Sequence, residues 1–294
     1  MNFAVIVTYN PNIDNVLSLL NILTDNDFQC IVVDNNSNTS FLKNKNKYSV
    51  INLEKNLGIA KAQNIGINKA VRNGADYIIF FDQDSTIDQS FLDKLTGDFL
   101  SVKKSGVKLA AIGPQFIDKE LGFYAPGLLV NRKGLIHKID ISQINEPKKV
   151  GVIISSGSLV STKALIDIGF MNEDLFIDYV DTEWCLRALN KGYKIYISNN
   201  ALMYHSIGEK TVRLGSINCP VHSPYRRYYR IRILFLLCRM IHISKLWIAN
   251  MFLNNFIATC ILFATQKNKI DYIKFLLLAV RDGLSNKKGI LNEN

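Results

Sequence analysis

Cysteine is scarce in this sequence, and its spacing suggests no paired site. The 294 residues contain five cysteines, an odd number, and no Cys-x-x-Cys pair: Cys30, Cys185, Cys219, Cys238 and Cys260. Their spacing predicts neither a zinc site nor a disulfide framework. We therefore expect reduced, mostly buried thiols in a cytosolic protein.

The N-terminus lacks the pattern of a secretory signal. No basic region precedes an apolar core, and the apolar run Phe3–Val7 stops at Thr8-Tyr9-Asn10-Pro11. A signal peptide needs a longer apolar segment, so we expect none and predict a cytoplasmic protein.

Acidic residues are outnumbered by basic ones, with 25 Asp and Glu against 35 Lys and Arg and a formal net charge of +10. This balance favours an anionic partner, which can be nucleic acid, a phosphate-bearing substrate or an acidic membrane surface. An apolar content of 48% excludes a disordered chain. The length allows one large domain, or a domain with an added segment.

The most informative stretch is Tyr77–Ser85, in which five apolar or aromatic residues lead into Asp82-Gln83-Asp84. Such a run is typical of an inner strand of a covered sheet. Successive side chains alternate along a strand, so Asp82 and Asp84 point to the same side at its carboxyl end. Paired carboxylates suit Mg²⁺ or Mn²⁺ together with diphosphate oxygens. The alternative is a strand followed by an ordinary acidic turn.

Two earlier strands end in the same way. Phe3–Val7 runs into Thr8-Tyr9-Asn10, and Gln29–Val33 runs into Asp34-Asn35-Asn36-Ser37, with a helix expected between them. This βαβ pattern predicts a doubly wound sheet whose strand ends assemble one cleft.

The next segments extend this pattern. Asn52–Ala60 is predicted as a short strand or turn before a helix over 61–73, where Gly58 presents backbone N–H groups to an anion or makes a plain turn. Val152–Ser161 is predicted as a strand with a small-residue kink. Residues 116–149 predict a loop and hairpin excursion.

Acidic side chains gather before and at the start of a helix predicted over 182–191. They exceed what helix capping needs, and one of them is a candidate catalytic base: Asp174, Asp178, Asp181 and Glu183.

The C-terminal part is basic, aromatic and then strongly apolar. Arginines and tyrosines interleave over 223–232, a pattern that suits nucleic acid, a diphosphate or a membrane headgroup region. Leu246–Gln266 is long enough to span a membrane, but Asn250 and Asn254 on one helical face favour an interfacial amphipathic helix. Packing on the preceding part of the chain without a membrane is the alternative.

Several ordered motifs resemble bacterial rhamnosyltransferases of glycosyltransferase family 2, over most of residues 3–232. They are Val7–Pro11, Val32–Ser37, Asn56–Ala60 with Ala62–Gly66, Phe81–Ser85, Gly157–Leu159, Leu175–Ala188 and Arg227–Tyr229. The resemblance implies the GT-A fold, a Rossmann-like doubly wound mixed sheet flanked by helices, here with a C-terminal helical appendage. It also implies a catalytic domain over 1–222, with a nucleotide-sugar half (1–115) and an acceptor half (116–222), followed by the segment 223–294.

The resemblance also implies roles for individual residues. Asp84 is expected to bind the divalent metal, Mg²⁺ or Mn²⁺, and His205 to complete its site. Asp181 matches the catalytic base and Glu183 a supporting acid; Val180 stands where many members carry an acidic residue, so Asp178 is a second candidate for the base. The nucleotide-sugar is expected to contact Thr8, Tyr9, Asn10, Asp34, Asn36, Ser37, Asn56, Gly58, Asn64, Asp82 and Gln83. Trp184, Arg227 and Tyr228 are expected to contact the acceptor or a phosphate.

These expectations describe an inverting transferase that uses dTDP-β-L-rhamnose and extends a lipid-linked surface polysaccharide, an O-antigen or capsule, at the inner face of the cytoplasmic membrane. A carboxylate takes the proton of the acceptor hydroxyl, and a metal stabilises the departing nucleoside diphosphate. A UDP-hexose donor is the first alternative. A basic nucleic-acid-binding protein is the remote one, because an acidic cleft repels a nucleic-acid backbone.

Overall fold

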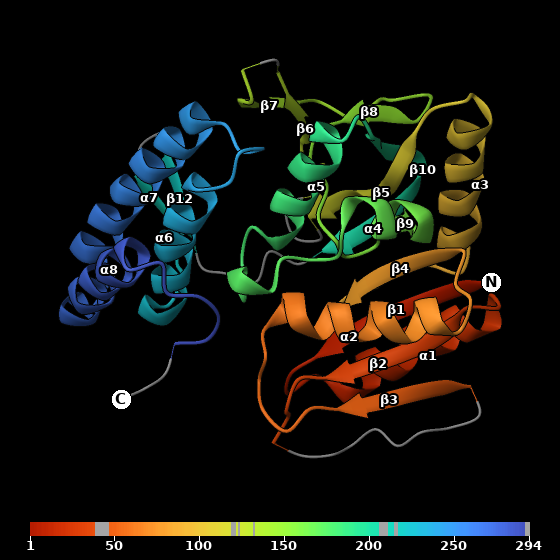
Figure 1. Ribbon diagram of the computed structural model, residues 1–294, viewed down its shortest axis with the longest axis horizontal. Coiled ribbons are helices and arrows are strands. Elements are labelled where there is room, and N and C mark those ends of the chain that lie inside the picture. The colour runs from red at the N-terminus through yellow and green to blue at the C-terminus, as the bar shows by residue number, and fades with distance from the viewer. Residues whose placement is uncertain are drawn as a thin grey trace.

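The computed structural model describes residues 1–38, 47–118, 122, 124–131, 133–205, 211–214 and 217–291. Its centre is a mixed eight-stranded sheet with the strand order β3-β2-β1-β4-β9-β5-β10-β8 (Figure 1). The strands are β1 (Asn2–Thr8), β2 (Gln29–Asp34), β3 (Tyr48–Asn52), β4 (Tyr77–Asp82), β5 (Leu109–Asp118), β8 (Lys148–Val150), β9 (Leu159–Ser161) and β10 (Lys194–His205).

Strands β1 to β4 run parallel to one another, as the βαβ pattern predicts. Strand β9 is antiparallel to both β4 and β5, which makes the sheet mixed. The predicted doubly wound, mixed sheet flanked by helices is therefore confirmed. Because β1, β2 and β4 are parallel, their carboxyl ends meet at one edge of the sheet.

Both faces of the sheet are buried, which explains the continuous apolar runs of its strands. In β1, Phe3 and Val5 face one hydrophobic core with helix α2, whereas Ala4 and Ile6 face a second core with helices α1 and α3. The helices that cover the sheet are α1 (Ile13–Asp25), α2 (Ile59–Arg72), α3 (Phe91–Lys104), α4 (Thr162–Ile168) and α5 (Val180–Asn190).

Two predicted strands differ from the observed ones. The third strand ends at Asn52, where the sequence pattern predicted it to begin, and residues 53–58 form the loop before α2. Within the predicted strand Val152–Ser161, only β9 (Leu159–Ser161) belongs to the sheet. The Ser155–Ser158 segment turns instead, because Gly157 adopts a φ of +73° that extended strands do not use.

The excursion predicted over 116–149 is confirmed for its described residues. It contains the end of β5, a two-stranded hairpin of β6 (Gly127–Val130) and β7 (Ile136–Ile139), and then β8 at the edge of the main sheet. A second hairpin, β11 (Thr211–Leu214) with β12 (Ile217–Pro220), precedes the C-terminal helices.

Three helices form the C-terminal part: α6 (Pro224–Cys238), α7 (Lys245–Thr265) and α8 (Lys269–Leu284). Figure 1 shows them stacked together beside the sheet, with α6 nearest to it. Side chains of α6 such as Tyr229 and Ile233 belong to the same hydrophobic core as α2, α4 and α5. The C-terminal helices thus share a core with the sheet part, and the proposed boundary at residue 222 crosses a continuous interior.

Candidate active site

The loops after β1, β2 and β4 are tied together at the carboxyl edge of the sheet. Thr8 pairs with Asp34 in register, and the Thr8 hydroxyl donates to the Asp34 carboxylate over 2.8 Å. The same carboxylate accepts from the Ser37 hydroxyl and backbone N–H, at 2.6 and 2.9 Å. Thr8 is fully buried, so this polar link holds the loops in place.

Exposed polar side chains border this link. The Tyr9 backbone N–H donates to Gln83 Oε1 (2.6 Å), and the Asn10 N–H donates to Ser37 Oγ (2.8 Å). Asn10 and Asn36 have φ angles of +48° and +68°, a region that asparagine tolerates better than most residues. The side chains of Tyr9, Asn10 and Asn36 are exposed to solvent. The structure thus brings these predicted nucleotide contacts together beside Asp82 and Gln83.

Asn56 and Gly58 have internal partners at this edge. Asn56 Oδ1 accepts from Asn35 Nδ2 and from the Gly58 N–H, both at 2.9 Å. At the start of α2, the Ile59 N–H donates to the Phe176 carbonyl over 2.8 Å. A Cβ on Gly58 would lie 2.5 Å from that carbonyl oxygen and from the Phe176 ring. Gly58 therefore lets Phe176 approach the helix, which corrects the expectation that it cradles an anion.

Asn64 lies inside the protein. Its Nδ2 donates to the Met171 carbonyl, and its Oδ1 accepts from the Met171 N–H, both at 2.9 Å. Asn64 is buried, so its amide joins α2 to the loop after α4. This corrects its predicted place in the nucleotide pocket.

Three carboxylates converge at the same edge, although one is about a hundred residues from the others. Asp82 ends β4, and Asp84 follows it with an exposed side chain. Burial, then repulsion from Asp84 and from Asp181, raises the pKa of Asp82 to about 7. Like charges influence each other in this way only at short range, so Asp181 belongs to the same acidic group. We call Asp82, Asp84 and Asp181 the acidic centre.

Asp181 lies in the first turn of α5 and is held by backbone donors. The N–H of Thr182 donates to its carboxylate over 2.7 Å, and the N–H of Ser155 is a second donor. Burial raises the pKa of Asp181 despite these hydrogen bonds. This geometry provides a fixed carboxylate with more affinity for a proton than an ordinary aspartate.

The Ser155–Ser158 segment connects the two sides of the acidic centre. The Asp82 N–H donates to Ser156 Oγ over 3.2 Å, and the hydroxyls of Ser156 and Ser85 lie 2.7 Å apart. The Ser155 hydroxyl accepts from Gln63 Nε2 at 3.1 Å. These serines were not among the predicted site residues. The run of small residues, interpreted as a place of close approach, was the available signal.

The loop before Asp181 has an unusual backbone. Phe176, Asp178 and Tyr179 all adopt positive φ angles, of 64°, 59° and 57°, which cost energy for residues other than glycine. The loop is held from α6, where the Phe176 ring stacks on Tyr229 with centroids 4.8 Å apart. Strain of this kind persists only where the surroundings impose it, and here it lies directly before the acidic centre.

Asp178 is engaged by that same helix. Its Oδ1 accepts from Arg230 Nη1 at 3.0 Å and from Arg226 Nη2 at 3.4 Å, and its side chain is only 7% exposed. Asp178 is close enough to Asp181 to raise the pKa of that residue slightly. Two guanidinium groups therefore contact one carboxylate oxygen of Asp178 and tie the loop before α5 to α6.

Glu183 is also engaged. It is 1% exposed and forms two hydrogen bonds with Arg187 (both 2.9 Å) and one with His242 Nε2 (2.8 Å). Burial alone would raise the pKa of Glu183, but the hydrogen bonds from His242 and Arg187 outweigh it and leave the pKa below its usual value. Glu183 therefore lies in a buried ion-pair network that joins α5 to the connection between α6 and α7.

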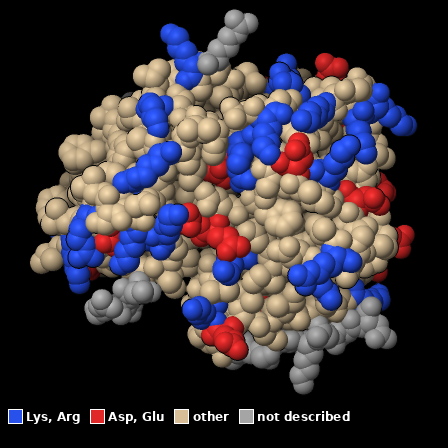
Figure 2. All heavy atoms as spheres, in the orientation of Figure 1, with Lys and Arg blue, Asp and Glu red and all other residues tan. Residues whose placement is uncertain are grey.

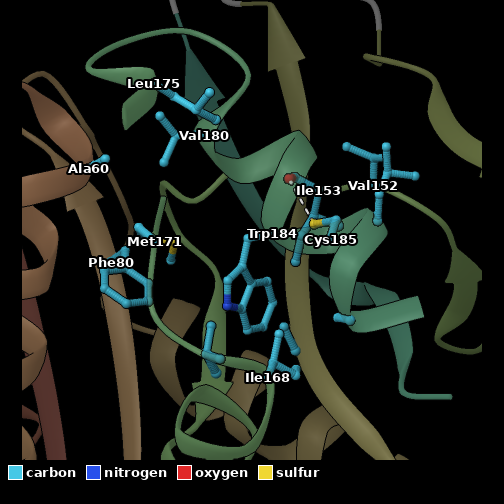
Figure 3. Close-up of a cluster of buried hydrophobic side chains, with 14 of the residues drawn as sticks. Ala60, Phe80, Val152, Ile153, Ile168, Met171, Leu175, Val180, Trp184 and Cys185 are labelled. Carbon is cyan, nitrogen blue, oxygen red and sulfur yellow. Dashed lines mark hydrogen bonds between the residues drawn. The ribbon is translucent and has the colours of Figure 1, made fainter. Parts of the chain in front are cut away.

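Three predicted acceptor contacts are interior residues. Trp184 lies in the hydrophobic core near Met171, Ile168 and Cys185 (Figure 3), and its Nε1 donates to the Gly169 carbonyl over 3.0 Å.

On α6, Arg227 is bound to α7, and the fully buried Tyr228 donates to Asp282 over 2.8 Å. These placements correct the expectation that Trp184, Arg227 and Tyr228 contact an acceptor or a phosphate.

A metal would have to be held by few protein ligands. Among the described residues, no three His, Cys, Asp or Glu side chains are grouped as a metal site. The side chain of His205, the predicted second ligand, lies outside the described residues. Asp82 and Asp84 nevertheless fit a divalent cation. The charge of Asp84 helps to raise the pKa of Asp82, and a bound cation would relieve the repulsion between the two carboxylates. One or two carboxylates plus substrate phosphates is the usual way to bind Mg²⁺.

The acidic centre differs in location from a groove of about 770 Å³ at the opposite edge of the sheet. That groove lies between α3 and α4, and Lys103, Thr162 and Tyr193 are among its lining residues. None of its lining residues belongs to the acidic centre.

Comparison with known proteins agrees with this fold. Solved structures share the fold at low identity. The crystal structure of S. aureus TarS matches with a TM-score of 0.59 at 20% identity, over 97% of this chain and 49% of that one. The chain thus spans about half the length of that structure. GalNAc-T7, solved with UDP, GalNAc and Mn²⁺, matches with a TM-score of 0.57 at 14% identity, over 97% of this chain and 57% of that one.

A closer relative is the dTDP-rhamnosyl transferase RfbF of Shigella flexneri, which is 44% identical over 291 residues, 98% of this chain and 96% of RfbF. The family model described as "Glycosyl transferase family 2" matches residues 3–169, more than half of the chain. The protein is therefore a glycosyltransferase, and the chain belongs to glycosyltransferase family 2.

Proposed function

We propose that this glycosyltransferase transfers L-rhamnose from dTDP-β-L-rhamnose, with inversion, to a growing bacterial surface polysaccharide such as an O-antigen or capsule. The observation that carries the donor assignment is the 44% identity with a dTDP-rhamnosyl transferase across nearly the whole length of both chains. The acidic centre supports the chemistry, because inverting transfer needs one carboxylate as a base and others beside the diphosphate.

Asp181 is the proposed catalytic base. It accepts the proton of the acceptor hydroxyl while that oxygen attacks the anomeric carbon and the bond to the diphosphate breaks. Its raised pKa suits this role, and the N–H groups of Thr182 and Ser155 keep the carboxylate oriented. Asp178, paired with Arg226 and Arg230, is proposed to position the loop rather than to accept the proton.

Asp84 is the proposed metal ligand, since its exposed carboxylate follows the end of β4. A bound Mg²⁺ or Mn²⁺ would neutralise charge on the diphosphate as it leaves. Asp82 and Gln83, with the exposed side chains of Tyr9, Asn10 and Asn36, are proposed to contact the nucleoside of the donor. Asp34 and Ser37 keep these loops in place through the link to Thr8.

The acceptor is proposed to be lipid-linked and to be met at the inner face of the cytoplasmic membrane. The net charge of +10 supports attraction to anionic lipid and to a lipid diphosphate. Of the described helices, α7 alone is long and apolar enough to cross a membrane, by length and composition only, with a mean hydropathy of 1.6.

A donor panel tests the proposal. Purified protein is incubated with dTDP-β-L-rhamnose, UDP-glucose or UDP-galactose, with Mg²⁺, Mn²⁺ or EDTA, and release of nucleoside diphosphate is measured with and without a lipid-linked acceptor. We expect turnover with dTDP-rhamnose only, and its loss in EDTA. Turnover with a UDP-hexose instead would establish the alternative donor. Turnover that persists in EDTA would refute the metal requirement.

A further inference from the structure

Helix α7 exposes large apolar side chains while it buries two polar ones among the apolar residues Trp247, Ile248 and Leu262. Its buried side includes the polar residues Asn255 and Thr259, which are 4% and 7% exposed. Its exposed side is mostly apolar, with Asn250 and Asn254 exposed along one edge of it, and the helix contains no Asp or Glu. The exposed large apolar side chains of α7 are Leu246, Leu253, Phe256, Ile257 and Phe263. A surface helix in water normally has the opposite arrangement.

Helix α8 adds a second apolar stripe with basic residues beside it. Ile270, Ile273, Leu277 and Leu284 are all exposed and recur at spacings of three, four and seven, so they lie along one side of the helix. Lys274 and Arg281, seven residues apart, run along the edge of this stripe. We call the exposed apolar side chains of α7 and α8 the outer surface.

Such a surface needs an explanation, because monomeric soluble proteins rarely expose large contiguous apolar patches. The two helices lie on the far side of α6 from most of the sheet (Figure 1), and side chains such as Phe256 and Leu277 are 61% and 65% exposed, so no described element covers them. Basic side chains are scattered over this part of the molecule in Figure 2, next to broad uncharged areas. Between residues 239 and 288 the chain has eight Lys and Arg against two Asp.

We propose that the outer surface docks on an anionic lipid leaflet, with α7 and α8 lying in the headgroup region and their apolar stripes against the acyl chains. Apolar area combined with positive charge is what binds interfacial helices to anionic lipid. The proposal identifies the surface that contacts the membrane. It rests on the proposed function, because membrane docking would give the enzyme access to a lipid-linked acceptor.

The contacts of α7 favour lying in the interface over crossing the membrane. The buried guanidinium of Arg227 donates to Asn255 Oδ1 (2.9 Å), to the Asn255 carbonyl (2.6 Å) and to Thr259 Oγ1 (2.7 Å). Moving α7 out of the bundle to span a bilayer would break all three bonds and leave a buried charge without partners.

Charge favours a lipid leaflet over a second copy of the chain. In a two-fold symmetric dimer the same patch occurs on both subunits, so the basic edges of two outer surfaces would be brought together. An anionic leaflet has the complementary charge.

The outer surface lies on the same helix that contacts the catalytic loop. On its inner side, α7 contacts the residue before α5: Asn255 Nδ2 donates to the Tyr179 hydroxyl (3.3 Å), and Trp247 packs edge-on against the Tyr179 ring with centroids 6.2 Å apart. If α7 docks on the membrane, the helix at the membrane therefore contacts Tyr179, which is two residues before Asp181.

Vesicle flotation of the full-length protein tests the proposal. Vesicles of phosphatidylcholine alone are compared with vesicles containing phosphatidylglycerol, at low and high salt. The variants are Leu253→Glu and Leu277→Glu, which place a charge on the outer surface of α7 and α8. The matched control is Ile166→Glu on α4, because Ile166 is 60% exposed and Leu277 is 65% exposed, but Ile166 lies in the groove at the opposite sheet edge.

We expect the wild-type protein and Ile166→Glu to float with anionic vesicles, and each outer-surface variant to lose about ten-fold or more in partition coefficient. Each basic residue near the leaflet contributes about five-fold, so binding should weaken at high salt. Circular dichroism and donor hydrolysis should be unchanged in all variants, which shows that they fold.

Three results would overturn the proposal. One is the absence of flotation with either vesicle type, and another is unchanged flotation of both outer-surface variants. The third is a wild-type dimer in light scattering that Leu277→Glu converts to a monomer without vesicle binding, since the outer surface would then be a contact between copies. Flotation requires neither donor nor acceptor, so its failure is distinguishable from failure of the donor panel.

Discussion

Replacing Asp82 by asparagine should stabilise the metal-free protein while it damages the active site. The pKa of Asp82 is about 7 in the folded protein against an ordinary value of 3.8, because burial and the charges of Asp84 and Asp181 disfavour ionisation. In an unfolded chain the carboxyl loses its proton near pH 4. Between about pH 4 and 7, unfolding therefore releases a proton, and this contribution to stability falls as the pH rises.

The full difference between the folded and unfolded pKa values of Asp82 corresponds to about 4 kcal/mol of free energy of unfolding. Wild type has this contribution below pH 4 and has lost it above pH 7. The asparagine variant has no such titration. At pH 5 about a third of the loss has already occurred, so the stability difference between variant and wild type should grow by about 2–3 kcal/mol from pH 5 to pH 8. Comparing the two proteins at each pH cancels the titrating groups that do not interact with Asp82.

The assay is urea unfolding in EDTA at pH 5 and pH 8, followed by circular dichroism and analysed by linear extrapolation. Adding Mg²⁺ or Mn²⁺ at pH 8 should stabilise wild type more than the variant, since a cation relieves the same repulsion. Asn15→Ala is a useful control at this edge, because it removes hydrogen bonds to the carbonyls of Gln83 and Ser85 without changing charge. A stability difference that does not change with pH would refute the placement of three carboxylates in one group.

Two further predictions concern residues that support the active site without belonging to the acidic centre. Glu183→Gln should destabilise the protein by about 3–5 kcal/mol in urea unfolding, because it leaves the guanidinium of Arg187 without its carboxylate partner, and Arg187→Lys is the milder comparison; a loss below 1 kcal/mol would show that the ion pair is not needed. Gly58→Ala should cost about 2–4 kcal/mol, from a φ of +82° and the overlap with Phe176. Gly97→Ala is its control, since no atom lies near the added Cβ; equal stability of the two variants would contradict the close approach of Phe176.

Local patterns were sufficient to predict the strand ends of the site. Apolar runs that stop at Thr8, Asp34 and Asp82 predict buried parallel strands, and parallel strands necessarily bring their carboxyl ends together. The meeting of Asp82 with Asp181 could not follow from such patterns, because it depends on α5 packing across a hundred residues of chain. The family resemblance supplied that pairing.

The incorrectly predicted side chains on α6 are ones whose direction depends on how the helix is rotated about its axis. On α6, successive residues differ by about 100° around the helix axis, so one position separates a site-facing arginine from a buried one. Arg226 and Arg230 reach Asp178, whereas the intervening Arg227 points into α7. Composition identified the basic and aromatic segment, but the rotation of the helix is set by its packing in the interior.

The central claim is that Asp181 is the base of a metal-dependent sugar transfer, and the rate of transfer by Asp181→Asn tests it most directly. Single-turnover transfer from dTDP-rhamnose is measured at saturating donor and metal, with donor affinity measured separately and Asp178→Asn as the comparison. We predict that Asp181→Asn keeps donor affinity within a few-fold and loses about 10²–10⁴ in rate, while Asp178→Asn loses less. A rate for Asp181→Asn within a few-fold of wild type would contradict the account.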